Sequence, residues 1–487
     1  MTRTTKLVIT LSIFAMAARL ILIDQPYIDH WSWRQSDVAA IARNFERNGF
    51  HFAYPQIDWA GDSPGYVGTE FAILPFVAAI CYKFAGVHEW IGRAQAVVFF
   101  AASLPFFFLF VREIFGETAA TWATFFYSFA PLNVFAGRSF MPDVPSLSLA
   151  LVGLYFFLRW IDSNKLAAYF AAAIAISFAL LIKLPSAVIG APLLFLVLQK
   201  WRWNFLRRPS LWLFAAITIL PSVAWYWHAY QIAARFYPHH FFGEGGIRIE
   251  NLSWYRSILA RTARLSLTPI LSILAIFGLF VTPGGKYTRV FHWWLAAMIL
   301  FVIIVGYGNR HPWYQLPLVP IAAAFAGAAC AFMQSKLVAS RIATVSLSGS
   351  VAGLFIIIAC LSVRPLYGSS AQQLRDAGLE LKKSTEADSL IVAADTGDPT
   401  IFYYAERHGW HFLEKNAIYN GNPRDTQQLI VDLERLRSRG ATHLVFTSNT
   451  LWWLEYYPEF ARYVSVSATL MNTTPQFKIY KLTAAIE

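Results

Sequence analysis

Charged residues are scarce in this sequence. Asp, Glu, Lys and Arg make up 14% of its 487 residues, whereas hydrophobic residues make up 57% and the mean hydropathy is +0.45. A soluble globular domain has roughly 25% charged residues. The composition therefore excludes an ordinary soluble protein and predicts a polytopic α-helical membrane protein.

Cysteine is also rare, and several common motifs are missing. The three cysteines, Cys81, Cys330 and Cys360, lie in apolar runs without metal-ligand spacing, so neither a zinc site nor a disulfide framework is predicted. No Walker loop, nucleophile elbow or dinucleotide fingerprint occurs. The net charge of +12 is better explained by basic cytoplasmic loops and anionic lipid than by nucleic acid.

Long apolar runs occupy most of the first 363 residues. About 11 segments have the length of membrane spans, and they fall near 7–23, 94–111, 118–136, 144–160, 166–182, 185–199, 210–228, 266–282, 289–306, 313–333 and 342–362. A further stretch, 71–85, is ambiguous. If it does not cross, basic loops at 200–209, 283–289 and 334–341 all face the cytoplasm, as the positive-inside tendency favours. We therefore interpret 71–85 as an interfacial or re-entrant helix.

The last part of the chain has a different pattern. Strand-like segments at 388–395, 441–447 and 477–482 alternate with a helical pattern at 426–439. This alternation predicts a small α/β domain, which an odd number of spans places outside the membrane. The predicted domains are a transmembrane domain at 1–363, with a first outer loop at 24–93, and an extracytoplasmic α/β domain at 364–487.

The few ionisable residues at the ends of the apolar runs are the candidates for function, because a charge at the rim of a membrane helix is costly to bury. The predicted topology places Asp37, Asp143, Lys183 and the segment 309–315 on the same outer face. This convergence indicates a membrane enzyme that works at one face of the bilayer.

Asp37 lies in a segment that predicts a helix. Ser32 and Gln35 have the spacing of a capping box at its start, and Arg34 and Asp37 lie on one face of its first turns. They form either a surface ion pair on an interfacial helix, or a carboxylate base held by a guanidinium that also binds phosphate. The side chains expected to be buried are Val38, Ile41, Ala42 and Phe45.

Asp143 and Lys183 flank later spans. Asp143 is either a helix N-cap, followed by Pro145 in the first turn, or a functional carboxylate. Arg138 in the same short loop is placed to pair with Asp143 or with an anion. Lys183 is either a lysine that extends to the interface and complements a helix end, or a ligand for a lipid phosphate, which we favour.

Three further residues are weaker candidates for a functional role. Glu70 lies where the outer stretch returns to the membrane, and Arg310 and His311 precede the tenth predicted span. His239 and His240 are expected to be ordinary loop residues, because they lack the spacing of metal ligands.

The order of these motifs resembles the GT-C superfamily of membrane glycosyltransferases, near the protein O-mannosyltransferases of glycosyltransferase family 39 and the lipid A aminoarabinose transferases. The resemblance covers nearly the whole chain, including the terminal α/β domain. It rests on five segments in a fixed order: SDVAAIARNF at 36–45, AGVHEWIGRA at 85–94 with Arg93, MPDVPS at 141–146, LIKLPSA at 181–187 and YQLPLVP at 314–320.

The resemblance implies a sugar carried on a polyprenyl phosphate and transferred to a lipid, glycan or protein hydroxyl at the periplasmic face of a bacterial inner membrane. It implies that Asp37 is the base, that Asp143 is a second acidic residue, and that Lys183 binds the donor phosphate. Arg34 and Arg138 are the further phosphate ligands that we expect. Direct displacement predicts inversion at the anomeric carbon. The resemblance specifies no cofactor with certainty, and a divalent metal held by Asp37 and Asp143 is left open.

Two departures from the family pattern keep alternatives open. The acidic pair of the first loop is replaced by Arg34-Gln35 when the helices are aligned, which makes Asp29 a rival of Asp37 for the base. The Lys-Pro-Pro motif of the aminoarabinose branch is replaced near Glu70, which argues against that exact donor. A surface-polysaccharide polymerase or ligase would use the same kind of donor. A transporter is the alternative from another class, but its ionisable residues would lie mid-span.

Overall fold

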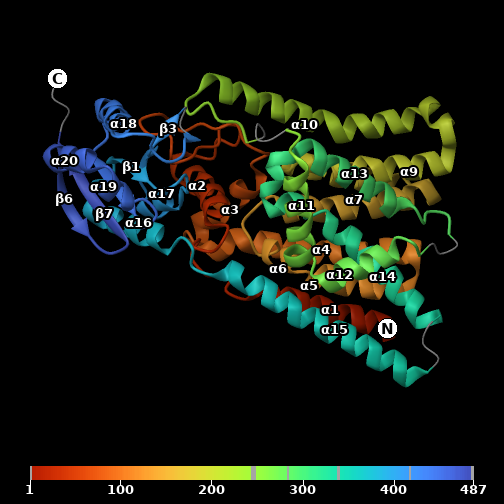
Figure 1. The fold of residues 1–487 in the computed structure, drawn as a ribbon. Coiled ribbons are helices and arrows are strands. Elements are labelled where there is room, and N and C mark those ends of the chain that lie inside the picture. Colours follow the sequence, from red (N-terminus) through yellow and green to blue (C-terminus); the bar gives the residue numbers. More distant parts are fainter. Residues whose placement is uncertain (1–2, 243–247, 282–284, 337–339, 416–417, 484–487) are drawn as a thin grey trace. The chain divides into compact units, whose positions relative to one another are not determined.

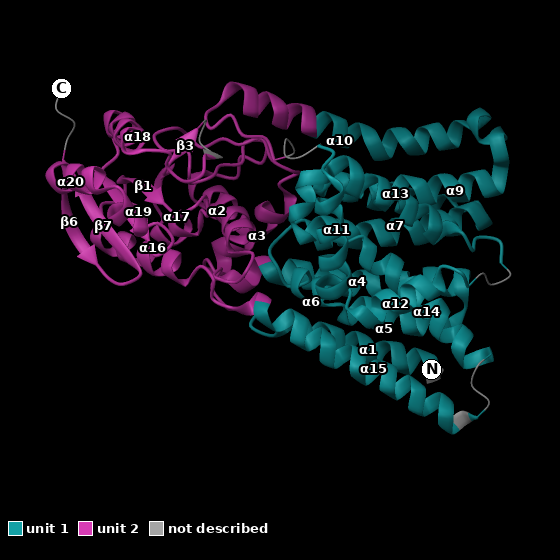
Figure 2. Cartoon of the chain, viewed as in Figure 1, with its two compact units in different colours: residues 1–23, 93–225, 244–365 teal, residues 24–92, 226–243, 366–487 magenta. Residues whose placement is uncertain are grey.

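Helices dominate the computed structural model, as the long apolar runs predict (Figure 1). The structure describes residues 3–242, 248–281, 285–336, 340–415 and 418–483. Its contacts divide the chain into two units, which Figure 2 colours separately. Unit 1 comprises Met1–Ile23, Arg93–Trp225 and Glu244–Pro365, and unit 2 comprises Asp24–Gly92, Tyr226–Gly243 and Leu366–Glu487. The domain boundary at residue 363 stays a prediction.

Unit 1 is built from helices. They are α1 (Arg3–Leu20), α4 (Glu89–Phe115), α5 (Glu117–Phe129), α6 (Pro131–Ala136), α7 (Asp143–Ser163), α8 (Leu166–Ile182), α9 (Gly190–Trp201), α10 (Pro209–Arg235), α11 (Leu252–Arg261), α12 (Pro269–Gly278), α13 (Val290–Val305), α14 (Leu318–Lys336) and α15 (Arg341–Val363). The start of α4 and the end of α10 belong to unit 2. Short 3₁₀ or π turns connect several of them: η1 (Leu184–Ile189), η2 (Arg202–Arg207), η3 (Thr262–Ser266), η4 (Gly306–Arg310), η5 (Pro312–Gln315) and η6 (Arg364–Tyr367).

The helices of the described chain confirm a multi-pass membrane protein. Seven stretches are long and apolar enough to cross a bilayer, and a bent pair, Leu252–Ser266 with Pro269–Gly278, adds an eighth. The count of about 11 spans stays a prediction. Helix α3 (Ile73–Ala85) has only 13 residues, or about 20 Å. It is therefore short for a hydrocarbon core of about 30 Å, which suits the interfacial or re-entrant helix predicted at 71–85.

Small residues bring the helices of unit 1 close together. A Cβ atom on Gly278 of α12 would lie 1.9 Å from the carbonyl oxygen of Phe325 in α14. A Cβ on Gly327 of α14 would lie 2.3 Å from the carbonyl oxygen of Ala119 in α5. In a membrane protein such contacts replace the hydrophobic effect as the source of helix association. The α5–α12–α14 core therefore depends on these two glycines.

Unit 2 combines the first outer loop with a C-terminal sheet. Its helices are α2 (Ser32–Asn48), α3, α16 (Gln372–Ser384), α17 (Thr400–Ala405), α18 (Thr426–Ser438), α19 (Trp452–Tyr456) and α20 (Pro458–Ser467). Its strands are β1 (Leu390–Ala394), β2 (His408–His411), β3 (Glu414–Lys415), β4 (Ile418–Tyr419), β5 (His443–Thr447), β6 (Ala468–Thr473) and β7 (Phe477–Leu482). The main sheet has the order β2-β1-β5-β7-β6, in which β1 is parallel to both of its neighbours and β7 is antiparallel to both of its own.

The predicted α/β character of the C-terminal part is confirmed. Strands β1, β5 and β7 and helix α18 occupy the four predicted segments. The apolar side of α18, formed by Leu429, Leu433 and Leu436, is fully buried. Strands β2 and β6 were not predicted, because β2 contains two histidines in four residues and the side chains of β6 are mostly exposed.

We expect Gly278→Leu and Gly327→Leu to prevent unit 1 from folding. Each new side chain would collide with the backbone of a neighbouring helix, which cannot move as a flexible side chain can. The measurement is the yield of monodisperse full-length protein after detergent extraction. Gly349→Leu on α15 is the matched control, because a Cβ at that position meets no atom within 4 Å. Equal yields of all three variants would contradict this account of the core.

Candidate functional site

Helix α2 is buried on nearly every side. Between Ser32 and Phe45 every side chain except that of Trp33 is buried, and this set includes the predicted Val38, Ile41, Ala42 and Phe45. A helix at a membrane surface would leave a polar face exposed. The interpretation of Arg34 and Asp37 as a surface ion pair is therefore wrong.

The start of α2 is not a capping box. Ser32 Oγ donates a hydrogen bond to Asp398 Oδ2 at 2.8 Å, and Gln35 Nε2 donates to Asp29 Oδ1 at 2.8 Å. The same Asp29 oxygen accepts a hydrogen bond from the backbone N–H of Trp31 at 3.1 Å. Both residues of the expected box thus bond outside the helix end, and Asp29 holds the turn that precedes it.

Arg34 lies between two carboxylates. Its Nη2 donates to the two oxygens of Glu70 at 2.8 and 2.9 Å, and its Nη1 lies 3.5 Å from Asp37 Oδ2. All three side chains are buried. Buried charges are tolerated when they are paired and hydrogen-bonded. The structure thus brings together the predicted Arg34 and Asp37 and adds Glu70, which was a weaker candidate.

Asp37 has a second polar contact, with Trp59. The indole Nε1 donates to Asp37 Oδ1 at 3.0 Å. Burial raises the pKa of Asp37 to about 6, against the opposing effects of Arg34 and the Trp59 hydrogen bond. A carboxylate with this pKa is ionised at neutral pH and is a stronger base than an exposed one. Asp37 therefore has the electrostatic properties of a general base.

Aromatic rings enclose Trp59 and Arg34. The ring of His240 lies 5.4 Å from that of Trp59 and 4.7 Å from that of Phe242, and the Arg34 guanidinium lies 4.7 Å from the Phe242 ring. Burial and the charge of Arg34 lower the pKa of His240 to about 4. His240 is therefore neutral and forms part of the wall around Arg34 and Trp59.

A carboxylate–imidazole pair packs against the ring of Trp59. His411 Nδ1 shares a hydrogen bond with the oxygens of Asp395, at 2.8 and 2.9 Å. The His411 ring packs 5.3 Å from the Trp59 ring. His411 ends β2 and Asp395 follows β1, and these two strands are parallel neighbours. The C-terminal sheet thus packs against the tryptophan that donates to Asp37.

The loop that carries Trp59 is fixed through Asp58. Arg43 of α2 forms an ion pair with Asp58, and Asn44 Nδ2 donates to Asp58 Oδ1 at 2.8 Å. The backbone N–H of Gly409 donates to the carbonyl of Asp58 at 3.1 Å, and the N–H of Gly61 donates to the carbonyl of Gly409 at 2.7 Å. Helix α2 and strand β2 therefore hold this loop from two sides.

Unit 1 contains the second group of predicted residues. Helix α7 begins at Asp143, and its N-cap residue makes no side-chain cap hydrogen bond. Asp143 Oδ1 instead lies 3.7 Å from Lys183 Nζ. Both side chains are buried, with Lys183 only 6% exposed. The interpretations of Asp143 as an N-cap and of Lys183 as a lysine that extends to the interface are therefore wrong.

A small cavity of about 20 Å³ borders this pair. Its wall includes Asp143, Lys183, Trp313 and Tyr314, and the ammonium of Lys183 lies 5.5 Å from the Tyr314 ring. A buried ammonium beside an aromatic wall is suited to an anionic oxygen. The binding of a phosphate by Lys183 stays a prediction.

The remaining predicted residues of unit 1 are more peripheral. Arg138 is buried between α6 and α7, with its guanidinium 5.5 Å from the Phe135 ring. His311 stacks on Trp313 at 4.5 Å and thus borders the cavity indirectly, whereas the Arg310 guanidinium lies 3.9 Å from the Tyr307 ring.

Sequence reasoning missed Trp59, which donates to Asp37, and the His411–Asp395 pair that packs against Trp59. Trp59 lies in a loop without periodicity, and His411 lies on a strand that was not recognised. Asp395 does give a signal, because functional side chains gather at the carboxyl ends of parallel strands.

The structure provides no support for a preformed metal site. Within residues 3–242, 248–281, 285–336, 340–415 and 418–483, no three His, Cys, Asp or Glu side chains come together in a way that could hold an ion. The two predicted ligands, Asp37 and Asp143, lie beside the cations of Arg34 and Lys183, which would repel a metal cation. The divalent metal stays a prediction.

Comparisons with known proteins agree with the predicted resemblance. Residues 72–227 match the family described as dolichyl-phosphate-mannose-protein mannosyltransferase. No curated protein matches the chain by sequence.

Two solved structures share the fold over almost all of this chain. ArnT from Cupriavidus metallidurans bound to undecaprenyl phosphate has a TM-score of 0.72 and 14% identity, and the match covers 99% of both chains. The archaeal oligosaccharyltransferase AglB from Archaeoglobus fulgidus has a TM-score of 0.66 and 12% identity, with 99% of this chain and 74% of that one covered. The chain therefore has the fold of these two structures, which confirms the predicted fold class.

We expect Asp37→Asn to melt at a higher temperature than the wild type at pH 7.5. The folded-state pKa of Asp37, about 6, lies above the ordinary value of 3.8, so ionisation of Asp37 opposes folding as the pH rises through this range. The difference should shrink at pH 5, where folded Asp37 is protonated and resembles Asn.

The comparison variant is Glu70→Gln, which removes the bidentate partner of Arg34 and should lower the melting temperature at pH 7.5. Thermal unfolding of the purified protein at both pH values is the measurement. An Asp37→Asn protein that melts below the wild type at pH 7.5 would contradict the proposed electrostatics.

Proposed function

We propose that this chain is a membrane glycosyltransferase that moves a sugar from a polyprenyl-phosphate donor to an acceptor hydroxyl. The fold and the family match support this class of enzyme. The related structures were obtained with undecaprenyl phosphate for ArnT and with an inhibitory peptide and a dolichol-phosphate for AglB. A polyprenyl phosphate keeps its reacting carbon near the membrane, so a soluble nucleotide-sugar domain is unnecessary.

The buried carboxylate of Asp37 is the observation that carries the proposed mechanism. The acceptor oxygen attacks the anomeric carbon while the bond from that carbon to the phosphate oxygen breaks. The acceptor proton passes to Asp37, and the electron pair of the broken bond leaves with the polyprenyl phosphate. Attack from the face opposite the leaving group inverts the anomeric carbon. A base with a pKa of about 6 suits this proton transfer at neutral pH.

Lys183 is the proposed ligand of the donor phosphate. Its ammonium is buried, lies beside a cavity and is balanced by Asp143 at 3.7 Å. Charge that develops on the departing phosphate is stabilised best by such a preorganised cation. Arg138 is a second proposed ligand, and Asp143 is proposed to orient Lys183.

Arg34 is proposed to hold Asp37 in place. Because its Nη2 is bidentate to Glu70 and its Nη1 faces Asp37, its charge is already balanced before any substrate binds. Its predicted contact with the donor phosphate is therefore proposed as a secondary role.

We further propose that the reaction takes place at the periplasmic face of a bacterial inner membrane. The support is the predicted placement of the basic loops in the cytoplasm. The acceptor is a lipid, a glycan or a protein.

We expect Asp37→Asn to lose about 10²- to 10⁴-fold in kcat, the usual effect of removing a general base. In the wild type, kcat/KM should fall about tenfold per pH unit below pH 6, because protonated Asp37 cannot accept the acceptor proton. The assay is sugar release from a panel of undecaprenyl-phosphate-linked hexoses and pentoses by protein in vesicles. Asp388→Asn, an exposed carboxylate, should behave as the wild type, and full activity of correctly inserted Asp37→Asn would refute the assignment.

Lys183→Gln should weaken the binding of undecaprenyl phosphate about tenfold or more, because a buried charge-assisted contact is lost. The measurement is a titration of the purified protein with undecaprenyl phosphate alone, which requires no knowledge of the sugar. Lys165→Gln is the matched control, since Lys165 is exposed at the opposite end of α8. If both variants bind equally well, Lys183 is not a phosphate ligand.

A further inference from the structure

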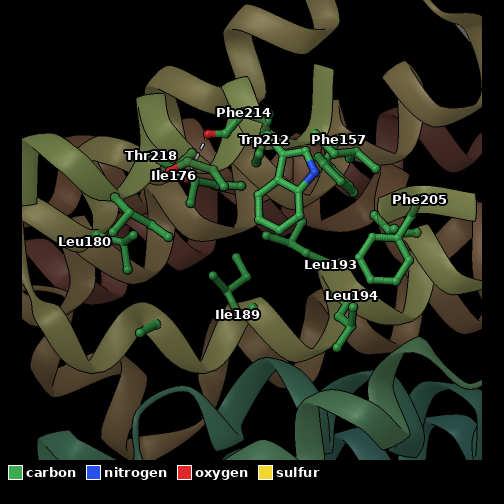
Figure 3. Close-up of a pocket in the computed structure, with 16 residues that line it drawn as sticks. Phe157, Ile176, Leu180, Ile189, Leu193, Leu194, Phe205, Trp212, Phe214 and Thr218 are labelled. Carbon is green, nitrogen blue, oxygen red and sulfur yellow. Dashed lines mark hydrogen bonds between the residues drawn. The ribbon is translucent and has the colours of Figure 1, made fainter. Parts of the chain in front are cut away.

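An apolar pocket of about 310 Å³ lies between helices α8, α9 and α10 of unit 1 (Figure 3). Three side chains of its inner wall, Phe157, Ile176 and Ile189, are at most 2% exposed. Three others at its mouth, Leu194, Trp212 and Ile219, are 40%, 58% and 50% exposed. The pocket therefore opens sideways, toward the surface that a membrane protein presents to lipid.

The polar groups in the wall of the pocket are already hydrogen-bonded. The hydroxyl of Thr218 donates to the carbonyl of Phe214 at 3.0 Å, as the dashed line in Figure 3 shows. The indole N–H of Trp212 donates to the carbonyl of Leu206 at 2.9 Å. All other lining side chains are hydrocarbon. The matching occupant is a hydrocarbon chain, because a polar group would lose its bonds to water without replacement.

Cations gather at one end of this pocket. Phe205 of η2 lines the pocket, and the surrounding turn carries Lys200, Arg202, Arg207 and Arg208, of which the three arginines are exposed. No Asp or Glu occurs between Asp162 and Glu244 in the sequence. Across the described parts of the chain, none of these four side chains is ion-paired with a carboxylate. The Arg208 guanidinium lies 4.7 Å from the Trp201 ring. The pocket thus joins a hydrocarbon wall to positive charge that no carboxylate of the described residues balances.

This cationic end lies far from Lys183 within unit 1. The Trp201 ring, just before η2, lies 5.7 Å from the ring of Trp160, near the end of α7. Asp143, the partner of Lys183, is the first residue of the same helix. The helical rise between Asp143 and Trp160 is about 25 Å. A lipid whose phosphate contacts Lys183 therefore cannot place that phosphate at η2.

We infer that the pocket binds an acyl chain of an anionic glycerophospholipid whose headgroup phosphate contacts Arg202, Arg207 and Arg208. Basic clusters next to apolar surfaces between membrane helices recognise such lipids through charge and chain burial together. The site uses neither Asp37 nor Lys183. Lipid binding at this site can therefore be confirmed or refuted independently of the proposed transferase activity.

Two kinds of variant distinguish the contribution of the cations to lipid binding from that of the apolar pocket. Arg202→Gln/Arg207→Gln/Arg208→Gln removes the cations and leaves the wall intact. Gly190→Leu fills the pocket, since Gly190 lines it and a Cβ there meets no atom within 4 Å. Ala215→Leu narrows the same pocket from α10 and is measured in parallel, so that the result does not depend on a single variant. The matched controls are Gly349→Leu, which also has open space, and Lys415→Gln/Lys478→Gln/Lys481→Gln, which removes three charges from unit 2.

The experiment is native mass spectrometry of the delipidated full-length protein, titrated with dioleoyl phosphatidylglycerol, dioleoyl phosphatidylethanolamine or undecaprenyl phosphate. We expect the wild type and both controls to prefer phosphatidylglycerol. The triple arginine variant should bind it about tenfold or more weakly and lose that preference. Gly190→Leu and Ala215→Leu should weaken both glycerophospholipids while leaving undecaprenyl phosphate unchanged.

Three results would overturn the inference. One is phosphatidylglycerol binding by the triple arginine variant as tight as that of the wild type. Another is unchanged binding by both pocket-filling variants. The third is a parallel loss of undecaprenyl phosphate in those variants, which would identify the pocket as part of a donor site. Lys183→Gln should leave phosphatidylglycerol binding unaltered, so failure of the donor assignment remains distinguishable.

Discussion

The buried guanidinium of Arg34 is the interaction on which the site in unit 2 depends. One positive charge lies beside two carboxylates, and it is shared unequally: Glu70 receives a bidentate contact at 2.8 and 2.9 Å, whereas Asp37 is left at 3.5 Å. Because most of the compensation goes to Glu70, desolvation outweighs attraction at Asp37 and its pKa rises to about 6. The unequal sharing thus gives one of two neighbouring carboxylates the properties of a base.

The same helix is held by residues far away in the sequence. Ser32 and Ser36 of α2 bond to Asp398 and Thr400, and Arg43 bonds to the carbonyl of Tyr403. These three contacts, spaced along the helix, all meet the segment between β1 and β2. The C-terminal sheet therefore forms the environment that buries the charges of α2. The first outer loop and the C-terminal sheet are accordingly parts of a single unit.

The sequence predicted those features that depend on local pattern. Apolar runs identified the helices of unit 1, alternation identified β1, β5 and β7, and the spacing of Arg34 and Asp37 placed them on one face of a helix. Local sequence patterns did not predict the contacts between segments that are far apart in the chain. The capping box at Ser32 failed because Asp398 offered a better partner, and Trp59 could not be linked to Asp37 without the fold of its loop. The Asp143–Lys183 pair joins the ends of adjacent helices, a relation that topology suggests but periodicity does not fix.

Among the cations of unit 1, burial and pairing with a carboxylate are better indicators of a functional role than positive charge alone. An exposed cation such as Arg207 is solvated by water and headgroups, so it needs no carboxylate and its presence follows from membrane topology alone. A buried cation such as Lys183 loses that solvation, and it is retained only with a partner at short range. Asp143 is that partner. Burying the two charges still costs desolvation free energy, and replacing both residues by apolar ones would remove that cost. A costly pair kept beside a cavity is therefore better explained by the binding of an anion than by the stability of the fold.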